Sequence, residues 1–135
     1  MFEFFEHTAD LGLRVRAADV DTLFEEAAKG LFTAVVEDLA VVEDREQVIL
    51  ELESDDYAYL LFDWLNELLY HFDTRRMVFG HFEVHVEGKR LKGVAGGELL
   101  DPVRHSLSHE VKAITYHRLR VEHADGWLAE VIVDI

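Results

Sequence analysis

The sequence predicts a single α+β domain in which two amphipathic helices pack on a mixed, mostly antiparallel sheet as a two-layer sandwich. Three observations support this prediction. The chain has 135 residues, and 50% of them are hydrophobic, which suits one domain with one core. Two stretches repeat apolar residues at helical spacing. Much of the remaining chain alternates apolar and polar residues, as strands do.

The first part of the chain predicts two strands and a helix. Residues 2–5 form a short apolar strand, and residues 11–17 alternate apolar and polar side chains as a half-buried strand does. Thr22 followed by Glu25 is a capping-box pattern, in which two side chains satisfy free N–H groups at the start of a helix. We therefore expect a helix over residues 22–37.

The middle of the chain predicts one strand followed by a second helix. Residues 48–52 alternate as a strand with one well-buried face, and Ser54 then offers a helix cap. Asp55 and Asp56 suit the positive end of a helix dipole, and the helical spacing continues to about Phe72. The expected buried stripe contains Leu60, Leu61, Trp64, Leu65, Leu68, Leu69 and Phe72.

The last part of the chain predicts an antiparallel meander. Strands are expected at residues 77–87, 90–95, 110–117, 117–123 and 127–134. Gly88 and the pair Asp125–Gly126 predict hairpin turns between them. Gly96 and Gly97 are too few for a phosphate-binding loop, and they predict a loop with positive φ angles.

The charge and the missing residue types exclude several classes of function. A net charge of −15 repels phosphates, so we expect no direct, high-affinity binding of nucleic acid. Cations and basic surfaces of protein partners are better suited. The chain has no cysteine, which excludes thiolate metal sites and thiol nucleophiles. No signal peptide or membrane-length apolar run is present, so we expect a cytoplasmic protein without a membrane partner.

Histidines and serines provide weaker candidate sites. His81 and His85 lie in an expected strand, where side chains four residues apart stand roughly 13 Å from each other, too far to share a metal. His105 and His109 lie in a loop, where solvated or hydrogen-bonding roles are the simpler interpretation. The serines of the same loop lack a nucleophile elbow.

Two carboxylates have unusual positions. Asp10 directly precedes a strand, and Asp134 ends the last strand beside the main-chain carboxylate of Ile135. If Asp10 reaches that end, three hard oxygen donors converge, a set suited to Ca²⁺ or Mg²⁺ rather than zinc. The alternative is ordinary solvated carboxylates, because the chain has 28 acidic residues. The residues alone leave both interpretations open.

Residues 109–117 contain a second candidate surface. Their alternation places Glu110 and Lys112 on one face with Tyr116. A paired Glu and Lys on a sheet face is usually a surface cross-link of little energetic weight. It could equally be a docking point for a partner.

Five blocks of the sequence, in order along the whole chain, resemble the archease family. They cover residues 6–13 (Glu-His-Thr-Ala-Asp-Leu-Gly-Leu), 22–28, 63–70, 110–117 (Glu-Val-Lys-Ala-Ile-Thr-Tyr-His) and 131–135. The resemblance implies an accessory protein and not an enzyme. Archeases promote guanylylation and multiple turnover of the GTP-dependent RNA ligase that joins 3′-phosphate or 2′,3′-cyclic phosphate ends to a 5′-hydroxyl, as in tRNA splicing and RNA repair.

The resemblance also implies a set of site residues. The family's metal, usually calcium with Mg²⁺ or Mn²⁺ as alternatives, maps onto Asp10, Asp134 and the main-chain carboxylate of Ile135. The family's functional lysine maps onto Lys112, and we expect Lys112, Glu110 and His7 to contact the partner ligase.

Two other functions stay open beside the ligase activator. A chaperone or modulator of an RNA-modifying methyltransferase, also suggested for archeases, would use an apolar patch and would not depend on Asp134. A metal-dependent hydrolase would hold its ion with Asp10 and Asp134 and use His117 or Glu110 as base. Turnover of a phosphoester by the isolated protein would indicate the hydrolase.

Overall fold

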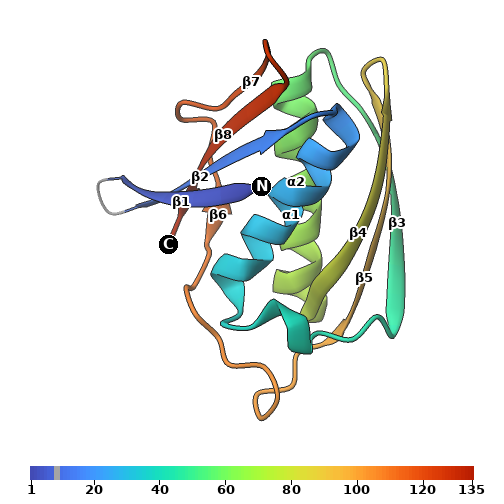
Figure 1. Ribbon diagram of the computed structural model, residues 1–135. Coiled ribbons are helices and arrows are strands. Elements are labelled where there is room, and N and C mark those ends of the chain that lie inside the picture. The colour runs from blue at the N-terminus through green and yellow to red at the C-terminus, as the bar shows by residue number, and fades with distance from the viewer. Residues whose placement is uncertain (8–9) are drawn as a thin grey trace.

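The structure is a computed structural model that describes residues 1–7 and 10–135. Residues 8–9 and the side chain of His7 belong to the first archease-like block and lie outside the described residues. Two antiparallel sheets enclose the two helices (Figure 1). The five-stranded sheet has the order β1-β2-β8-β6, with β7 also paired to β8; its strands are β1 (Phe2–His7), β2 (Asp10–Ala17), β6 (Ala113–Ile114), β7 (Arg120–His123) and β8 (Trp127–Asp134). The three-stranded sheet has the order β3-β5-β4, from β3 (Glu46–Glu53), β4 (Met77–Glu87) and β5 (Arg90–Leu99).

The helices form the middle layer of the molecule. Helix α1 (Val20–Val35) contacts β2 on one side and β4 on the other, and helix α2 (Tyr57–Arg75) contacts β6 and β3 in the same way. A short 3₁₀ turn, η1 (Leu39–Val41), follows α1. Within the described ranges, neither helix is both long enough and apolar enough to cross a bilayer.

The α+β class, the two amphipathic helices and the antiparallel pairing agree with the sequence prediction. The sandwich has one layer more than expected, because the strands divide into two sheets that cover opposite sides of the helices. Both helices therefore bury a wide part of their surface. Trp64 lies fully buried in this middle layer, and its indole N–H donates a hydrogen bond of 3.1 Å to the carbonyl of Phe24.

The predicted helix caps at Thr22 and Ser54 are wrong. Helix α1 begins at Val20, and its cap is Asp19, whose carboxylate accepts from the Thr22 N–H at 2.8 Å. Helix α2 is capped in the same way by Asp56, which accepts from the Tyr59 N–H at 2.8 Å. Aspartate and serine cap a helix by the same physical means, so the pattern of caps alone does not decide which residue starts the helix.

The predicted hairpin turns are confirmed, but the predicted loop at the paired glycines is wrong. Gly88, Asp125 and Gly126 have positive φ angles of 62°, 49° and 96°. Gly96 and Gly97 lie inside β5 without positive φ. An added Cβ at Gly97 would stand 1.9 Å from the carbonyl oxygen of Val78, so close approach of the neighbouring strand explains this glycine.

The predicted strands over residues 110–117 and 117–123 are too long. Of residues 110–123, only Ala113–Ile114 and Arg120–His123 pair with β8. Both short strands pair with β8, at different places along it. A turn separates them, in which the Leu119 N–H donates a hydrogen bond of 3.2 Å to the Tyr116 carbonyl. Residues 109–112 therefore remain an exposed connection, apart from the buried Val111.

Candidate metal centre

The strand register brings Asp10 and Asp134 together. Strand β2 begins at Asp10 and β8 ends at Asp134, and the two residues are direct partners in the antiparallel pairing of these strands. Figure 1 shows the C-terminus on the side of the five-stranded sheet where β2 begins. Residues near the two ends of the sequence thus meet at one end of a sheet.

The geometry of the pair places two carboxylates on one face of the sheet. Directly opposed residues of an antiparallel pair have Cα atoms roughly 4.5–5.5 Å apart and point their side chains to the same side. Asp10 and Asp134 are both half-buried. Like charges in this position destabilise the pairing, and a cation bound between them removes that cost.

Residues of the third strand border the pair. Ala113 of β6 is the register partner of Asp134, and the Lys112 N–H donates to the Asp134 carbonyl at 2.7 Å. The side chains of Lys112 and Glu110 are exposed. The backbone of His7 is the register partner of Asp10 in β1, while its side chain lies outside the described residues. The backbones of Lys112 and His7, two of the residues expected to contact a partner, therefore lie next to the carboxylate pair.

Ile135 continues past the end of β8. It is half-buried and packs against the hydrophobic core, as its phase with Val131 and Val133 predicts. Over residues 1–7 and 10–135, no three His, Asp or Glu side chains gather as a metal-binding group. An ion held by Asp10 and Asp134 would therefore need further oxygen ligands, such as water, to complete its coordination. This donor set of oxygens alone fits Ca²⁺, Mg²⁺ or Mn²⁺.

The outer face of the same sheet carries a ladder of alternating charges farther along the strands. Arg14 contacts Glu3 at 3.4 Å and Glu130 at 3.3 Å, and Arg120 contacts Glu122 at 3.0 Å and also pairs with Glu130. Although burial raises it, the hydrogen bonds from Arg120 and Arg14 hold the pKa of Glu130 below its usual value. The middle of this face is therefore neutralised by arginines.

Comparison with known proteins supports the relationship suggested by the five blocks. Residues 2–135 match the archease protein family. Curated archeases include one from Methanopyrus kandleri, 45% identical, with 99% of both chains covered, and one from Pyrococcus furiosus, 40% identical, with 99% of this chain and 98% of that protein covered.

The chain belongs to the archease family.

Solved structures agree with this assignment. The solution structure of a protein from Methanobacterium thermoautotrophicum is 38% identical, has a TM-score of 0.87 and covers 99% of this chain and 98% of that chain. The crystal structure of an archease from Thermotoga maritima, described as a possible chaperone, is 22% identical with a TM-score of 0.68, and it shows the same fold. It covers 100% of this chain and 98% of that one.

The two histidines of the first pair, His81 and His85, contact oxygen atoms of other residues. His81 bonds to the carbonyl of Val42 at 3.1 Å, while His85 lies between the carboxylates of Asp21 at 3.3 Å and Glu87 at 3.6 Å. The hydrogen bond and charge of Asp21 raise the pKa of His85. A histidine between two carboxylates is stabilised in its protonated form, which binds no metal.

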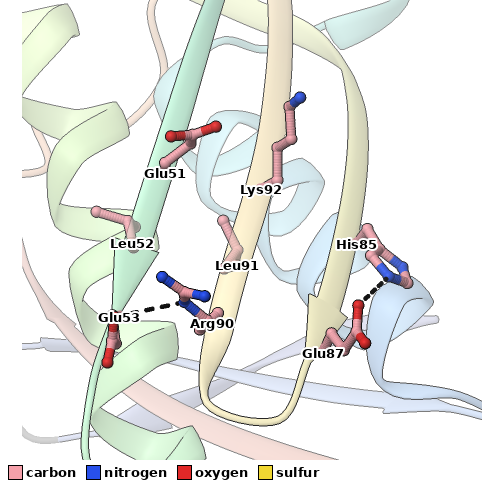
Figure 2. Close-up of a pocket in the computed structure, with 8 residues that line it drawn as sticks. All are labelled: Glu51, Leu52, Glu53, His85, Glu87, Arg90, Leu91 and Lys92. Atoms are coloured by element: carbon pink, nitrogen blue, oxygen red, sulfur yellow. Dashed lines mark ion pairs between the residues drawn. The ribbon is translucent and has the colours of Figure 1, made fainter.

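A shallow pocket lies on the outer face of the three-stranded sheet (Figure 2). Opposite charges pair within it, with Arg90 3.5 Å from Glu53 and His85 3.6 Å from Glu87. Its lining residues are Glu51, Leu52, Glu53, His85, Glu87, Arg90, Leu91 and Lys92. None of the residues expected in the metal site or at the partner contact belongs to this lining.

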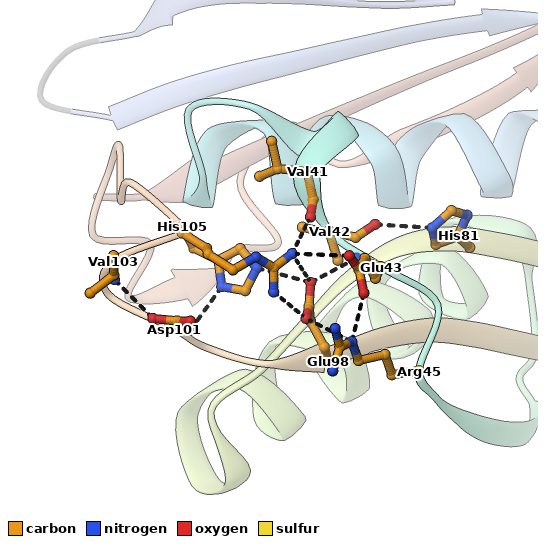
Figure 3. Close-up of polar contacts among 10 residues, drawn as sticks. Val41, Val42, Glu43, Arg45, His81, Glu98, Asp101, Val103 and His105 are labelled. Atoms are coloured by element: carbon orange, nitrogen blue, oxygen red, sulfur yellow. Dashed lines mark hydrogen bonds and ion pairs between the residues drawn. The ribbon is translucent and has the colours of Figure 1, made fainter.

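A buried ionic cluster around Glu98 was not predicted from the sequence (Figure 3). Arg104 contacts the Glu98 carboxylate at 2.7 Å and 3.1 Å, and the Glu43 N–H donates to the same carboxylate at 2.7 Å. The Glu98 side chain is only 6% exposed. Hydrogen bonds from Arg104, then from the Glu43 N–H and His105, overcome the effect of burial and lower the pKa of Glu98 to about 2.

The histidine of this cluster has a defined hydrogen-bond role. His105 is 1% exposed, its Nδ1 accepts from the Asp101 N–H at 2.8 Å, and its Nε2 lies 3.1 Å from Glu98. We infer the neutral tautomer with hydrogen on Nε2, because Nδ1 is occupied as an acceptor. This agrees with the hydrogen-bonding interpretation of His105. The cluster fixes the loop after β5, and both oxygens of the Glu98 carboxylate accept hydrogen bonds within it, so we assign it to the fold.

Proposed function

We propose that this archease is a metal-binding accessory protein of the cytoplasm that promotes guanylylation and multiple turnover of a GTP-dependent RNA ligase, in tRNA splicing and RNA repair. The observation that carries the proposal is the register pairing of Asp10 with Asp134, bordered by the Lys112 backbone. Membership in the archease family supports the choice of partner.

In this proposal, Asp10, Asp134 and the main-chain carboxylate of Ile135 hold one Ca²⁺, or Mg²⁺ or Mn²⁺. A bound divalent ion would supply positive charge beside the ligase's nucleotide phosphates. The protein's own residues fix the position of that charge: the β2–β8 register sets the two aspartates opposite each other, and the packing of Ile135 against the core holds the strand end.

Lys112 and Glu110 would contact the ligase next to the ion. Both are exposed, and the hydrogen bond from the Lys112 N–H to the Asp134 carbonyl ties their segment to the end of β8. The net charge of −15 favours docking on a less acidic protein surface and disfavours direct RNA binding. RNA would then be bound by the ligase alone.

A ligation assay with limiting cognate ligase and GTP tests the proposal. The parent protein is expected to convert a single turnover into multiple turnovers, and Asp10→Asn and Asp134→Asn are expected to lose most of this stimulation. Asp73→Asn, which removes an exposed carboxylate of α2, is the matched control and should stimulate as the parent does. Full stimulation by both metal-site variants would overturn the mechanism.

A chaperone or modulator of an RNA-modifying methyltransferase is the second candidate. Exposed apolar side chains such as Tyr59 and Tyr116, 50% and 59% exposed, favour a protein-binding surface. Such a function would survive Asp134→Asn, so the same variants separate the two candidates. Phosphoester turnover by the isolated protein would instead indicate the hydrolase.

A further inference from the structure

An exposed aromatic cluster lies where α2 meets the segment after β6. The rings of Phe62 and Tyr116 stack with centroids 4.0 Å apart and planes at 16°, and Tyr59 approaches the Tyr116 ring edge-on at 5.6 Å. Tyr116 is 59% exposed although Phe62 stacks on its ring, so a large part of this side chain is accessible to solvent. Two half-exposed tyrosines beside each other provide a polarisable aromatic surface.

A carboxylate accompanies these rings. Asp63 follows Tyr59 by four residues on α2, so the two side chains lie on the same side of the helix. Asp63 is half-buried, and burial raises its pKa. Within residues 1–7 and 10–135, its side chain makes no hydrogen bond or ion pair. We call Tyr59, Phe62, Asp63 and Tyr116 the Tyr116 patch.

An arginine elsewhere in the protein shows which side chain can bind an aromatic ring and a carboxylate together. Arg14 lies over the Phe5 ring, 4.7 Å from its centroid, and pairs at the same time with the carboxylates of Glu3 and Glu130. A planar guanidinium can stack on a ring and bond to a carboxylate together. In the described part of the chain, the arginines that lie over rings contact Phe5 and Phe72, and none lies over the Tyr116 patch.

We propose that the Tyr116 patch binds an arginine side chain of the partner ligase, with the guanidinium stacked on the exposed tyrosine rings and paired with Asp63. The identity of the partner rests on the proposed function. Charge favours this occupant over a nucleotide or RNA, because Asp55 and Asp56 at the start of α2 add to the negative charge near Tyr59. Lysine fits less well, because its ammonium group cannot stack as a plane.

Titration of the protein into the ligation assay separates docking from activation. Asp63→Asn and the double variant Tyr59→Leu/Tyr116→Leu are expected to raise the concentration that gives half-maximal stimulation by about fivefold or more, with an unchanged plateau. Asp10→Asn and Asp134→Asn should instead lower the plateau. The matched controls are Tyr70→Leu, at an exposed tyrosine of the same helix, and Asp73→Asn; both should leave the half-maximal concentration unchanged.

A peptide experiment tests the patch without the ligase. A tetra-arginine peptide is expected to shift the NMR resonances of Tyr59 and Tyr116 in the parent but not in Asp63→Asn, and a tetra-lysine peptide should bind several-fold more weakly. Patch variants that keep the parent's half-maximal concentration and circular dichroism spectrum would overturn the inference. Equal binding of both peptides, or tighter binding of a single-stranded RNA oligonucleotide, would also overturn it. A parent that binds tetra-arginine at the patch but fails to stimulate ligation would disprove the proposed function and leave the arginine site standing.

Discussion

The buried Glu98 carboxylate and the Asp10–Asp134 pair have different surroundings in the fold. Glu98 lies buried at the end of β5, with Arg104, His105 and the Glu43 N–H bonded to it. Asp10 and Asp134 are half-buried, and the strand register sets them directly opposite each other. The first arrangement brings its cation and donors from the same chain, so it serves stability. The second brings two like charges together, an arrangement that a bound cation would stabilise.

Removing the buried carboxylate should have the largest effect. Glu98→Gln is expected to lower the free energy of unfolding by about 3 kcal/mol, because it leaves Arg104 and its neighbours without their charged partner. Chemical denaturation at neutral pH measures the change. Glu43→Gln is the control, since the Glu43 side chain is 54% exposed, and it should cost less than about 1 kcal/mol. Equal losses in both variants would show that the cluster adds no special stability.

Acid should remove the contribution of Glu98 to the free energy of unfolding of the parent protein. The pKa of Glu98 is lowered from 4.5 to about 2 in the folded protein, so its contribution is complete above pH 4.5 and is lost as the pH falls towards about 2. The difference in unfolding free energy between the parent and Glu98→Gln should therefore narrow over this range. Parallel denaturation series of the two proteins measure it, and a gap that stays constant down to about pH 2.5 would contradict the shift.

Calcium bound at the aspartate pair should raise the free energy of unfolding, by less than Glu98→Gln lowers it. Free calcium at ten times its dissociation constant is expected to stabilise the parent by about 1.4 kcal/mol, and Asp134→Asn should lose this gain. Thermal unfolding with calcium and with a chelator measures both states.

The metal-free state provides the control for this experiment. With chelator present, Asp134→Asn should be as stable as the parent or more stable by about 0.2–1 kcal/mol, because one of two opposed charges is gone. A variant that is destabilised in chelator, and that still responds to calcium, would show that the pair is structural, like the Glu98 cluster.

The two regions also differ in how far they could be predicted. Asp10 and Asp134 stand out in the sequence by their places at strand ends, and the archease resemblance predicts a metal site on them and on the main-chain carboxylate of Ile135. The Glu98 cluster joins Glu43, Glu98, Arg104 and His105, which are separated by up to 62 residues and carry no shared motif. Only the packing of the loop after β5 against the connection after α1 brings them together.

Both helices, most of the strands and the turns at Gly88 and Asp125–Gly126 could be predicted from the sequence alone. These features depend on neighbouring residues: a helix on apolar spacing along its own face, a strand on alternation, and a turn on a residue that adopts positive φ. The tertiary structure alone decided the division of the strands into two sheets, the close strand contact that requires Gly97, and the pairing of Asp10 with Asp134. Each of these depends on which distant segments pack together, and local spacing carries no information about that choice.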